Sequence, residues 1–192
     1  LRARLRMAGG TLDRTGNLLG ALSLALADRT TDSVTGAAAR SISGAAALSA
    51  LLHFLDRPSV DLLRQVLGLT SSGTVRLVDG LERDGLVRRQ RGDDARVTAI
   101  ALTAKGRREA ERVSAARAEV LESALSGLAP ADRERLDGLL GEVLVGMIRG
   151  PGATRWMCRL CDTGACGRER GECPVANATG AVRASLRSAR SS

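Results

Sequence analysis

The chain has 192 residues, of which 44% are hydrophobic and 1% are aromatic, and its formal net charge is +8. It is long enough to bury a core, and a core dominated by Leu and Ala is expected to be helical. The excess of arginine favours a polyanionic partner, nucleic acid before membrane, and no stretch reaches the roughly 18 apolar residues that a membrane-spanning helix needs.

The first predicted helix covers residues 11–29, where four leucines recur at helical spacing: Leu12, Leu19, Leu22 and Leu26. Three arginines before the apolar run 18–27 superficially resemble a secretory signal. The amphipathic spacing instead favours a helix of the folded protein. We therefore expect a cytoplasmic protein, in which disulfides are disfavoured and thiols are available to metals.

A buried helix followed by two short helices is predicted next. The buried helix covers residues 43–55 and ends before Pro58. Ser59 is expected to cap the following helix and Gly68 to close it, and Thr70 is expected to cap a second helix that ends at residues 84–85. Such a pair is a helix-turn-helix, whose second helix normally enters the DNA major groove.

The outer face of that second helix carries the first candidate DNA contacts. Three apolar residues are assigned to the inner face: Val75, Val78 and Leu81. The candidate contacts lie on or near the opposite face: Ser71, Ser72, Thr74 and Arg76. Short hydroxyl side chains at a helix N-terminus, where backbone N–H groups attract phosphate, suit close approach to a duplex. Asp79 on the same side is a mild objection.

A β-hairpin is predicted after the second helix, with strands near residues 86–90 and 97–102 around a polar turn. Arginines concentrate on it, and an extended Arg-rich ribbon beside a recognition helix is the shape that reaches a minor groove. The predicted DNA contacts are Arg89, Arg91 and Arg96, with Arg96 in the groove and Asp94 orienting an arginine. The alternative is a solvated hairpin with ordinary surface charge.

Three motifs follow one another in this region: Asp84-Gly85-Leu86-Val87, Asp94-Ala95-Arg96 and Leu102-Thr103-Ala104-Lys105-Gly106. They resemble hallmarks of the MarR family of winged-helix repressors, and the resemblance covers about residues 11–149. It implies a mainly α fold, a winged helix-turn-helix with a small β-hairpin wing and an interlocked helical dimerisation region. It also implies an obligate homodimer on double-stranded DNA with a palindromic operator.

Two more amphipathic helices are predicted, one that Thr103 caps and that runs to about Leu125, and one that Pro130 opens. They are more apolar than one small domain requires, which favours a helical dimer interface. The expected organisation is an N-terminal dimerisation helix and connector (1–42), a winged helix-turn-helix DNA-binding domain (43–102), dimerisation helices (103–150), a cysteine-rich metal- or cluster-binding loop (151–178) and a basic tail (179–192).

The four cysteines of the chain lie within sixteen residues, at Cys158, Cys161, Cys166 and Cys173. So short a segment holds too little apolar bulk to fold alone, and four thiolates can bind one tetrahedral metal ion or a small iron–sulfur cluster. The C-x2-C start and the final Cys173-Pro174 resemble the cluster loop of SoxR-type regulators, although the middle spacings are longer here. The segment is expected to extend from the end of the dimerisation region.

An iron–sulfur cluster, with [2Fe–2S] favoured over [4Fe–4S], is the first prediction for these thiols, structural zinc is the alternative, and a thiol–disulfide switch is the third reading. The predicted function is a sequence-specific regulator, expected to be a repressor, that senses redox state, nitric oxide or iron supply. The alternative is a repressor that responds to a small-molecule effector and carries structural zinc. No enzyme is expected, because C-x2-C lacks a thioredoxin-like context here. His53 is expected to pack in its helix rather than bind metal.

Overall fold

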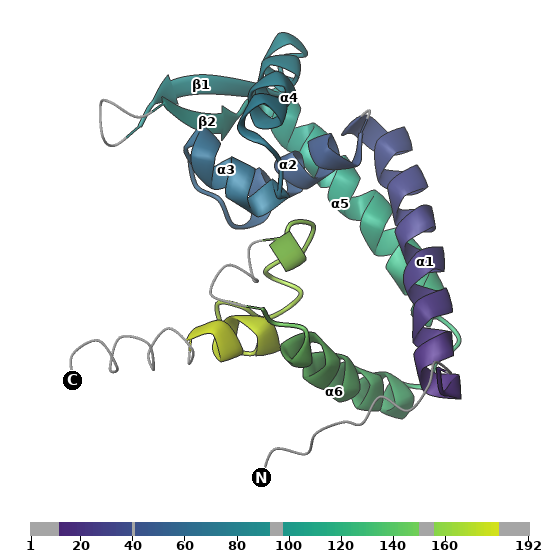
Figure 1. Ribbon diagram of the computed structural model, residues 1–192. Helices are drawn as coiled ribbons and strands as arrows, with labels where there is room; N and C mark the ends of the chain where they lie inside the picture. Colours follow the sequence, from purple (N-terminus) through teal and green to yellow (C-terminus); the bar gives the residue numbers. More distant parts are fainter. Residues whose placement is uncertain (1–11, 40, 93–97, 150–155, 181–192) are drawn as a thin grey trace, which may run out of the picture.

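The computed structural model describes residues 12–39, 41–92, 98–149 and 156–180. Helices and a single hairpin form three parts, which Figure 1 shows: a winged unit, a long helix pair leading away from it, and a helix across the far end. The elements in chain order are α1 (Arg14–Val34), the π-helical segment η1 (Thr35–Ala39), α2 (Ile42–His53), α3 (Val60–Leu67), α4 (Ser71–Arg83), β1 (Val87–Arg91), β2 (Thr98–Leu102), α5 (Ala104–Leu125) and α6 (Pro130–Gly146).

The helix starts in the winged unit agree with the capping residues predicted from the sequence. Ser59 Oγ accepts a hydrogen bond from the Leu62 N–H at 3.1 Å, and Thr70 Oγ1 accepts one from the Gly73 N–H at 3.1 Å. Thr103 likewise caps α5, and Pro130 stands at the first position of α6. Because each cap satisfies a backbone donor that the helix itself leaves unpaired, these local signals set where the helices begin.

The first helix differs from the prediction: α1 starts at Arg14, is capped by Asp13, and continues to Val34 rather than ending near residue 29. Val34 is fully buried, and Ser33 donates a hydrogen bond to the Ala116 carbonyl of α5 at 3.2 Å. Packing against α5 therefore extends a helix whose last turns, rich in Thr and Ser, have weak helical propensity of their own.

The core of the winged unit forms around α2. Residues 44–50 of this helix are all buried, and most of them are small, so α3 and α5 can pack closely against it. Larger side chains from the other elements complete the core, including Val34, Leu63, Val78, Ile100 and Val113. The core is thus aliphatic and largely helical, as the composition predicted.

The wing is a two-stranded antiparallel sheet in which Val87 pairs with Leu102 and Arg91 pairs with Thr98. The Ile100 N–H also donates to the Pro58 carbonyl at 2.9 Å, which ties the start of α3 to β2. A helix-turn-helix followed by such a hairpin is a winged helix-turn-helix. The predicted fold class, mainly α with a small hairpin wing, is confirmed.

The far part of the molecule leaves many apolar side chains exposed. No residue of α6 is buried, and Leu139, on α6, is 60% exposed. Exposed apolar residues also cluster on and just before α1, among them Leu18, Leu19 and Leu22. The helix α6 ends at Gly146. None of the described helices has the length and apolar character to span a membrane.

Candidate nucleic-acid interface and cysteine site

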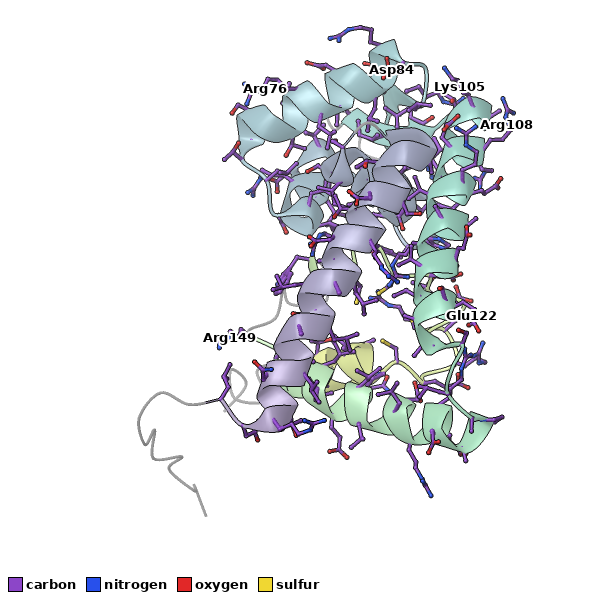
Figure 2. The ribbon with its side chains drawn as sticks, turned by 90° about the vertical axis from the view of Figure 1, so that its right-hand side faces the viewer. Arg76, Asp84, Lys105, Arg108, Glu122 and Arg149 are labelled. Carbon is purple, nitrogen blue, oxygen red and sulfur yellow. The ribbon has the colours of Figure 1, made fainter. Side chains whose placement is uncertain are left out.

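The outer face of α4 is formed by its first two turns. Ser71, Ser72 and Arg76 are exposed there, as predicted from the sequence, and the N-terminal backbone N–H groups of the helix lie beside the two serines. Arg76, in the second turn of α4, and Asp84, at its C-terminal end, lie at the end of the molecule opposite α6 (Figure 2). Donor groups from the helix start and from Arg76 thus face one side of the molecule.

The assignment of two neighbouring residues of α4 was wrong. Thr74, predicted to face outward, is fully buried, and its hydroxyl donates to the Thr70 carbonyl at 3.0 Å. Val75, predicted to face inward, is 43% exposed. The buried set is Thr74, Val78 and Leu81, which share one helix face. Because the helix carbonyl satisfies the threonine hydroxyl, burying this residue costs little.

Val75 is therefore a surface residue that sequence reasoning missed. Thr74 lies four residues before Val78 and Val75 lies three residues before it, so both fit helical spacing, and valine was preferred for the core only because it is more apolar. The cap at Thr70 held the missing signal, since the fourth residue after a cap commonly packs inward against the residue before the cap. An exposed apolar side chain between Ser71, Ser72 and Arg76 suits contact with a thymine methyl group.

Arg89, a predicted DNA contact, forms ion pairs within the protein. Its guanidinium contacts the carboxylates of Asp79 and Glu82 on α4, and its backbone N–H donates to Glu82 Oε1 at 2.9 Å. Hydrogen bonding to Asp79 raises the pKa of Arg89. Arg89 therefore connects β1 to α4. It also neutralises the negative charge of Asp79, which the sequence analysis noted as unfavourable for DNA binding by this helix.

The remaining wing residues divide into two groups. Arg91, at the end of β1, is exposed, as is Arg88 in the same strand. Asp94 and Arg96, the predicted tip of the wing, lie outside the described residues. Among the predicted wing contacts that the structure describes, Arg91 is therefore the arginine that lies free of α4 at the surface.

The Arg89 pair has a consequence for stability at acidic pH. Hydrogen bonds from the Arg89 backbone and guanidinium lower the pKa of Glu82 below its ordinary value of 4.5. A carboxyl group with a lowered pKa in the folded protein stabilises the fold above its ordinary pKa, and this contribution is lost as the pH falls through the lowered value. We expect Glu82→Gln to have a flatter acid-induced loss of stability than the parent protein, measured as the unfolding midpoint by circular dichroism from neutral pH to about pH 3.

Glu111→Gln provides the matched control, because Glu111 is an exposed carboxylate on α5. This variant should follow the acid profile of the parent protein. An identical acid profile for Glu82→Gln and the parent protein would show that the Glu82 carboxylate does not stabilise the fold through its contact with the wing.

The four cysteines meet at one place. All of them line a cavity of about 680 Å³, which is bounded on the other side by α6. Cys158 and Cys173 are buried and form a small apolar cluster with Val175, against which Cys161 and Cys166 pack. The four candidate metal ligands thus line the same cavity.

Within this group the Cys166 thiol donates to the Thr163 carbonyl at 3.6 Å. Cys158 interacts mainly with Cys161 and also with Cys173, and Cys166 interacts with both Cys173 and Cys161. The hydrogen bond from Cys158 lowers the pKa of Cys161 to about 6, with further help from the charges of Arg117 and Arg168. The same pair raises the pKa of Cys158, and burial raises the pKa of Cys166. A thiolate at Cys161 beside two guanidinium groups is chemically suited to metal binding.

The four thiols line the cavity without closing around one point. Among the residues that the structure describes, no three His, Cys, Asp or Glu side chains are arranged to hold one metal ion. Gly167 has a φ of +63°, and a Cβ on it would lie 2.1 Å from Glu172 Oε2. This glycine thus allows the tight turn that returns the chain from Cys166 toward Cys173.

The cysteine segment does not simply extend from the dimerisation helices, as the sequence had suggested. Its residues 156–180 lie between α6 and the winged unit (Figure 1). Leu160 packs against the main core, and the Thr163 hydroxyl donates to the His53 carbonyl at the end of α2 at 2.8 Å. His53 itself is mostly buried, and its Nε2 lies 2.7 Å from Ser114 Oγ, so it packs as predicted.

Comparison with known proteins connects this chain to solved regulators. Neither the protein-family models nor the curated proteins contain a match to the sequence. The fold is similar to a MarR family protein from Bacillus stearothermophilus, at 26% identity and a TM-score of 0.63, over 73% of this chain and 100% of that one. It is also similar to the transcriptional regulator PA3341, at 28% identity and a TM-score of 0.54, over 69% and 97% of the two chains.

A third similar structure is MepR, a transcription regulator of the Staphylococcus aureus multidrug efflux pump MepA. It shares 20% identity and a TM-score of 0.60, over 71% of this chain and 100% of that one. A point mutant of MepR has been solved bound to an oligodeoxyribonucleotide. PA3341 and MepR are both described as transcription regulators.

Proposed function

We propose that this chain is a MarR-type DNA-binding transcriptional regulator, acting as a homodimeric repressor whose DNA binding responds to an iron–sulfur cluster held by its four cysteines. The observation that carries the DNA-binding half is the winged helix-turn-helix with Ser71, Ser72 and Arg76 exposed on one face of α4. Similar folds belong to transcription regulators, and one of them, MepR, binds an oligodeoxyribonucleotide as a mutant protein.

Three kinds of contact are assigned to this interface. The helix start at Ser71 and Ser72 approaches a phosphate, because backbone N–H groups and short hydroxyls donate there. Arg76 and Val75 face base edges, where guanidinium recognises guanine and an apolar side chain meets a thymine methyl. Arg91 on the wing reaches the flanking backbone, and Arg89 holds the wing at a fixed angle to α4.

The dimer is supported by where the apolar surface is exposed. Apart from Val75 and Trp156, the large hydrophobic side chains exposed in the described residues lie on α1 and α6 or immediately beside them. A monomeric soluble protein rarely exposes so extensive an apolar surface. A second copy that covers α1 and α6 would remove this surface from water, and it would place two α4 helices on one palindromic operator.

The cluster proposal is supported by the donor set and its grouping. In a [2Fe–2S] centre each of the two irons takes two protein ligands. All four thiols line one cavity, which supplies the number of ligands that two such irons need. Arg117 and Arg168 lie close enough to offset part of the thiolate charge. When bound, such a cluster supplies one-electron redox chemistry, while the protein residues hold it and exclude solvent.

The test is the colour and metal content of protein purified without oxygen. We expect visible absorption, with about two iron atoms and acid-labile sulfide per chain, and nearly complete loss of iron in Cys166→Ala. Met157→Leu is the matched control, since Met157 lines the same cavity and leucine has a similar volume. It should retain the iron. A colourless protein with about one zinc ion per chain would reject the cluster and favour structural zinc.

A second candidate signal is a small lipophilic molecule. A cavity of about 290 Å³ lies between α1, α5 and the cysteine segment, lined by Leu26, Ile42, Leu121, Met157 and Leu160 among others. This is near the lower end of the size of ligand pockets. A repressor of this second kind would release DNA on addition of a hydrophobic effector and would be indifferent to oxidants.

A further inference from the structure

We infer that the cysteine segment is a strut between α6 and the winged unit, in which Thr163 and its contact at the end of α2 transmit the state of the thiols to the DNA-reading part. This inference rests on the proposed function and adds the route by which the cysteine site acts on DNA binding. Thr163 is named as a positioning residue, because it acts through α2 rather than by touching DNA.

One end of the strut is fixed on the winged unit. The Thr163 hydroxyl is buried and donates to the His53 carbonyl at 2.8 Å. Asp162 Oδ1 lies 3.7 Å from His53 Nδ1, and the Arg168 guanidinium lies over the Phe54 ring at 6.0 Å. These contacts all fall on the last residue of α2 and the residue after it.

The other end of the strut rests on α6. Pro174 lies directly over Gly141, where an added Cβ would be 3.4 Å from Pro174 Cγ. The cavity between them is lined by Leu140, Leu144 and Val145 of α6 together with the four cysteines. Within the described part of the chain, α6 has no extensive packing of its own on the winged unit, so the strut forms its main link to α2.

The position of Thr163 in the sequence makes the link sensitive to the thiols. Cys161 and Cys166 bracket residues 162–165, so the contact residues are held between two of the four thiols. The apolar cluster of the segment is small, consisting of two cysteines and Val175 with a few half-buried neighbours. A segment with so little core depends on its thiols for order, and their release would free Asp162 and Thr163 from the end of α2.

The end of α2 is well placed to pass on such a change. Residues 44–50 of α2 are buried against α3, α4 and α5, so this part of the helix moves as a unit, whereas residues 51–53 are only half-buried. Loss of the His53 contact therefore shifts the packing of α2 under α4, or loosens the last turn of α2. Either response changes how the recognition helix is presented to DNA.

The test compares Thr163→Val with Thr179→Val in the full-length protein. Both threonines are buried, at 8% and 6% exposure, but Thr179 donates only to carbonyls within its own helical turn. Hydrogen exchange is followed at the Phe54 and Leu55 amides, which both bond to the Ala50 carbonyl. In protein that retains its metal, we expect Thr163→Val to speed exchange there by about threefold to tenfold, the effect of one lost hydrogen bond, and Thr179→Val to leave it unchanged.

Metal removal from the parent protein should speed hydrogen exchange at the same amides. In Thr163→Val, where exchange is already fast, metal removal should increase the rate only slightly. Thr163→Ser, which keeps the donor, should restore the parent behaviour. DNA affinity is measured on a duplex selected from random sequence, for the metal-loaded and the metal-free form of each variant. The ratio of these two affinities should move toward one in Thr163→Val and should stay at the parent value in Thr163→Ser and Thr179→Val.

The two proposals fail in different ways. Parent protein that is purified without any bound metal rejects the cluster. In that case faster exchange at residues 54–55 in Thr163→Val than in the parent protein supports the contact with α2, and equal exchange overturns the strut. A Thr163→Val protein with normal metal content, parent-like exchange at residues 54–55 and a parent-like affinity ratio overturns the strut and leaves the cluster in place.

Discussion

Replacement of Gly106 with alanine is expected to destabilise the fold by about 3 kcal/mol or more, at or above the upper end of the usual cost of forcing extra atoms into a packed region. A Cβ on Gly106 would lie 1.7 Å from the Leu86 carbonyl oxygen. That oxygen accepts a hydrogen bond from the Thr103 N–H at 3.0 Å, so it cannot move without opening the junction of the wing and α5. The measurement is denaturant unfolding followed by circular dichroism, at one protein concentration because a dimer is expected.

Gly80→Ala is the control for this experiment. Gly80 lies inside α4, and nothing would lie within 4 Å of an added Cβ. Alanine should be neutral there or stabilise the helix by up to about 1 kcal/mol, because it has the higher helical propensity. Equal stability of Gly106→Ala and the parent protein would contradict the close approach of α5 to residue 86.

Loss of Arg76 or Arg91 is expected to weaken DNA binding by about 1–3 kcal/mol each, equivalent to about fivefold to 150-fold. The two variants should differ in kind. Arg76→Ala should also relax sequence preference, because Arg76 is assigned to base edges on the outer face of α4. Arg91→Ala should weaken binding evenly across sequences and reduce the salt dependence by about one charge. Affinity is measured by fluorescence anisotropy on selected and random duplexes at several salt concentrations.

The control is Arg135→Ala, which removes the same charge from α6, where the Arg135 side chain is 80% exposed and contacts only the nearby Asp132 among the ion pairs described. It should bind DNA like the parent protein. If Arg76→Ala and Arg135→Ala lose affinity equally, the effect is one of overall charge, and the assignment of α4 as the reading helix fails.

The sequence by itself determined the elements and their order. Ser59, Thr70 and Thr103 cap helices where they were predicted to, since a cap depends on residues within one turn of one another. The hairpin, the start of α6 at Pro130 and the close group of four cysteines were likewise local patterns. The fold shows why the L-T-x-x-G motif has glycine at position 106: the backbone of Leu86 lies too close for a side chain there.

Only the tertiary structure decided which side chains distant in the sequence touch one another. Hydrophobicity alone predicted wrongly which of Thr74 and Val75 enters the core, and the cap at Thr70 was the local signal that favoured Thr74. The pairing of Arg89 with Asp79 and Glu82, and the contact of Thr163 with His53 across 110 positions, join residues that have no local signature. Such contacts arise when separately formed elements pack together, so their energies are absent from any short stretch of sequence.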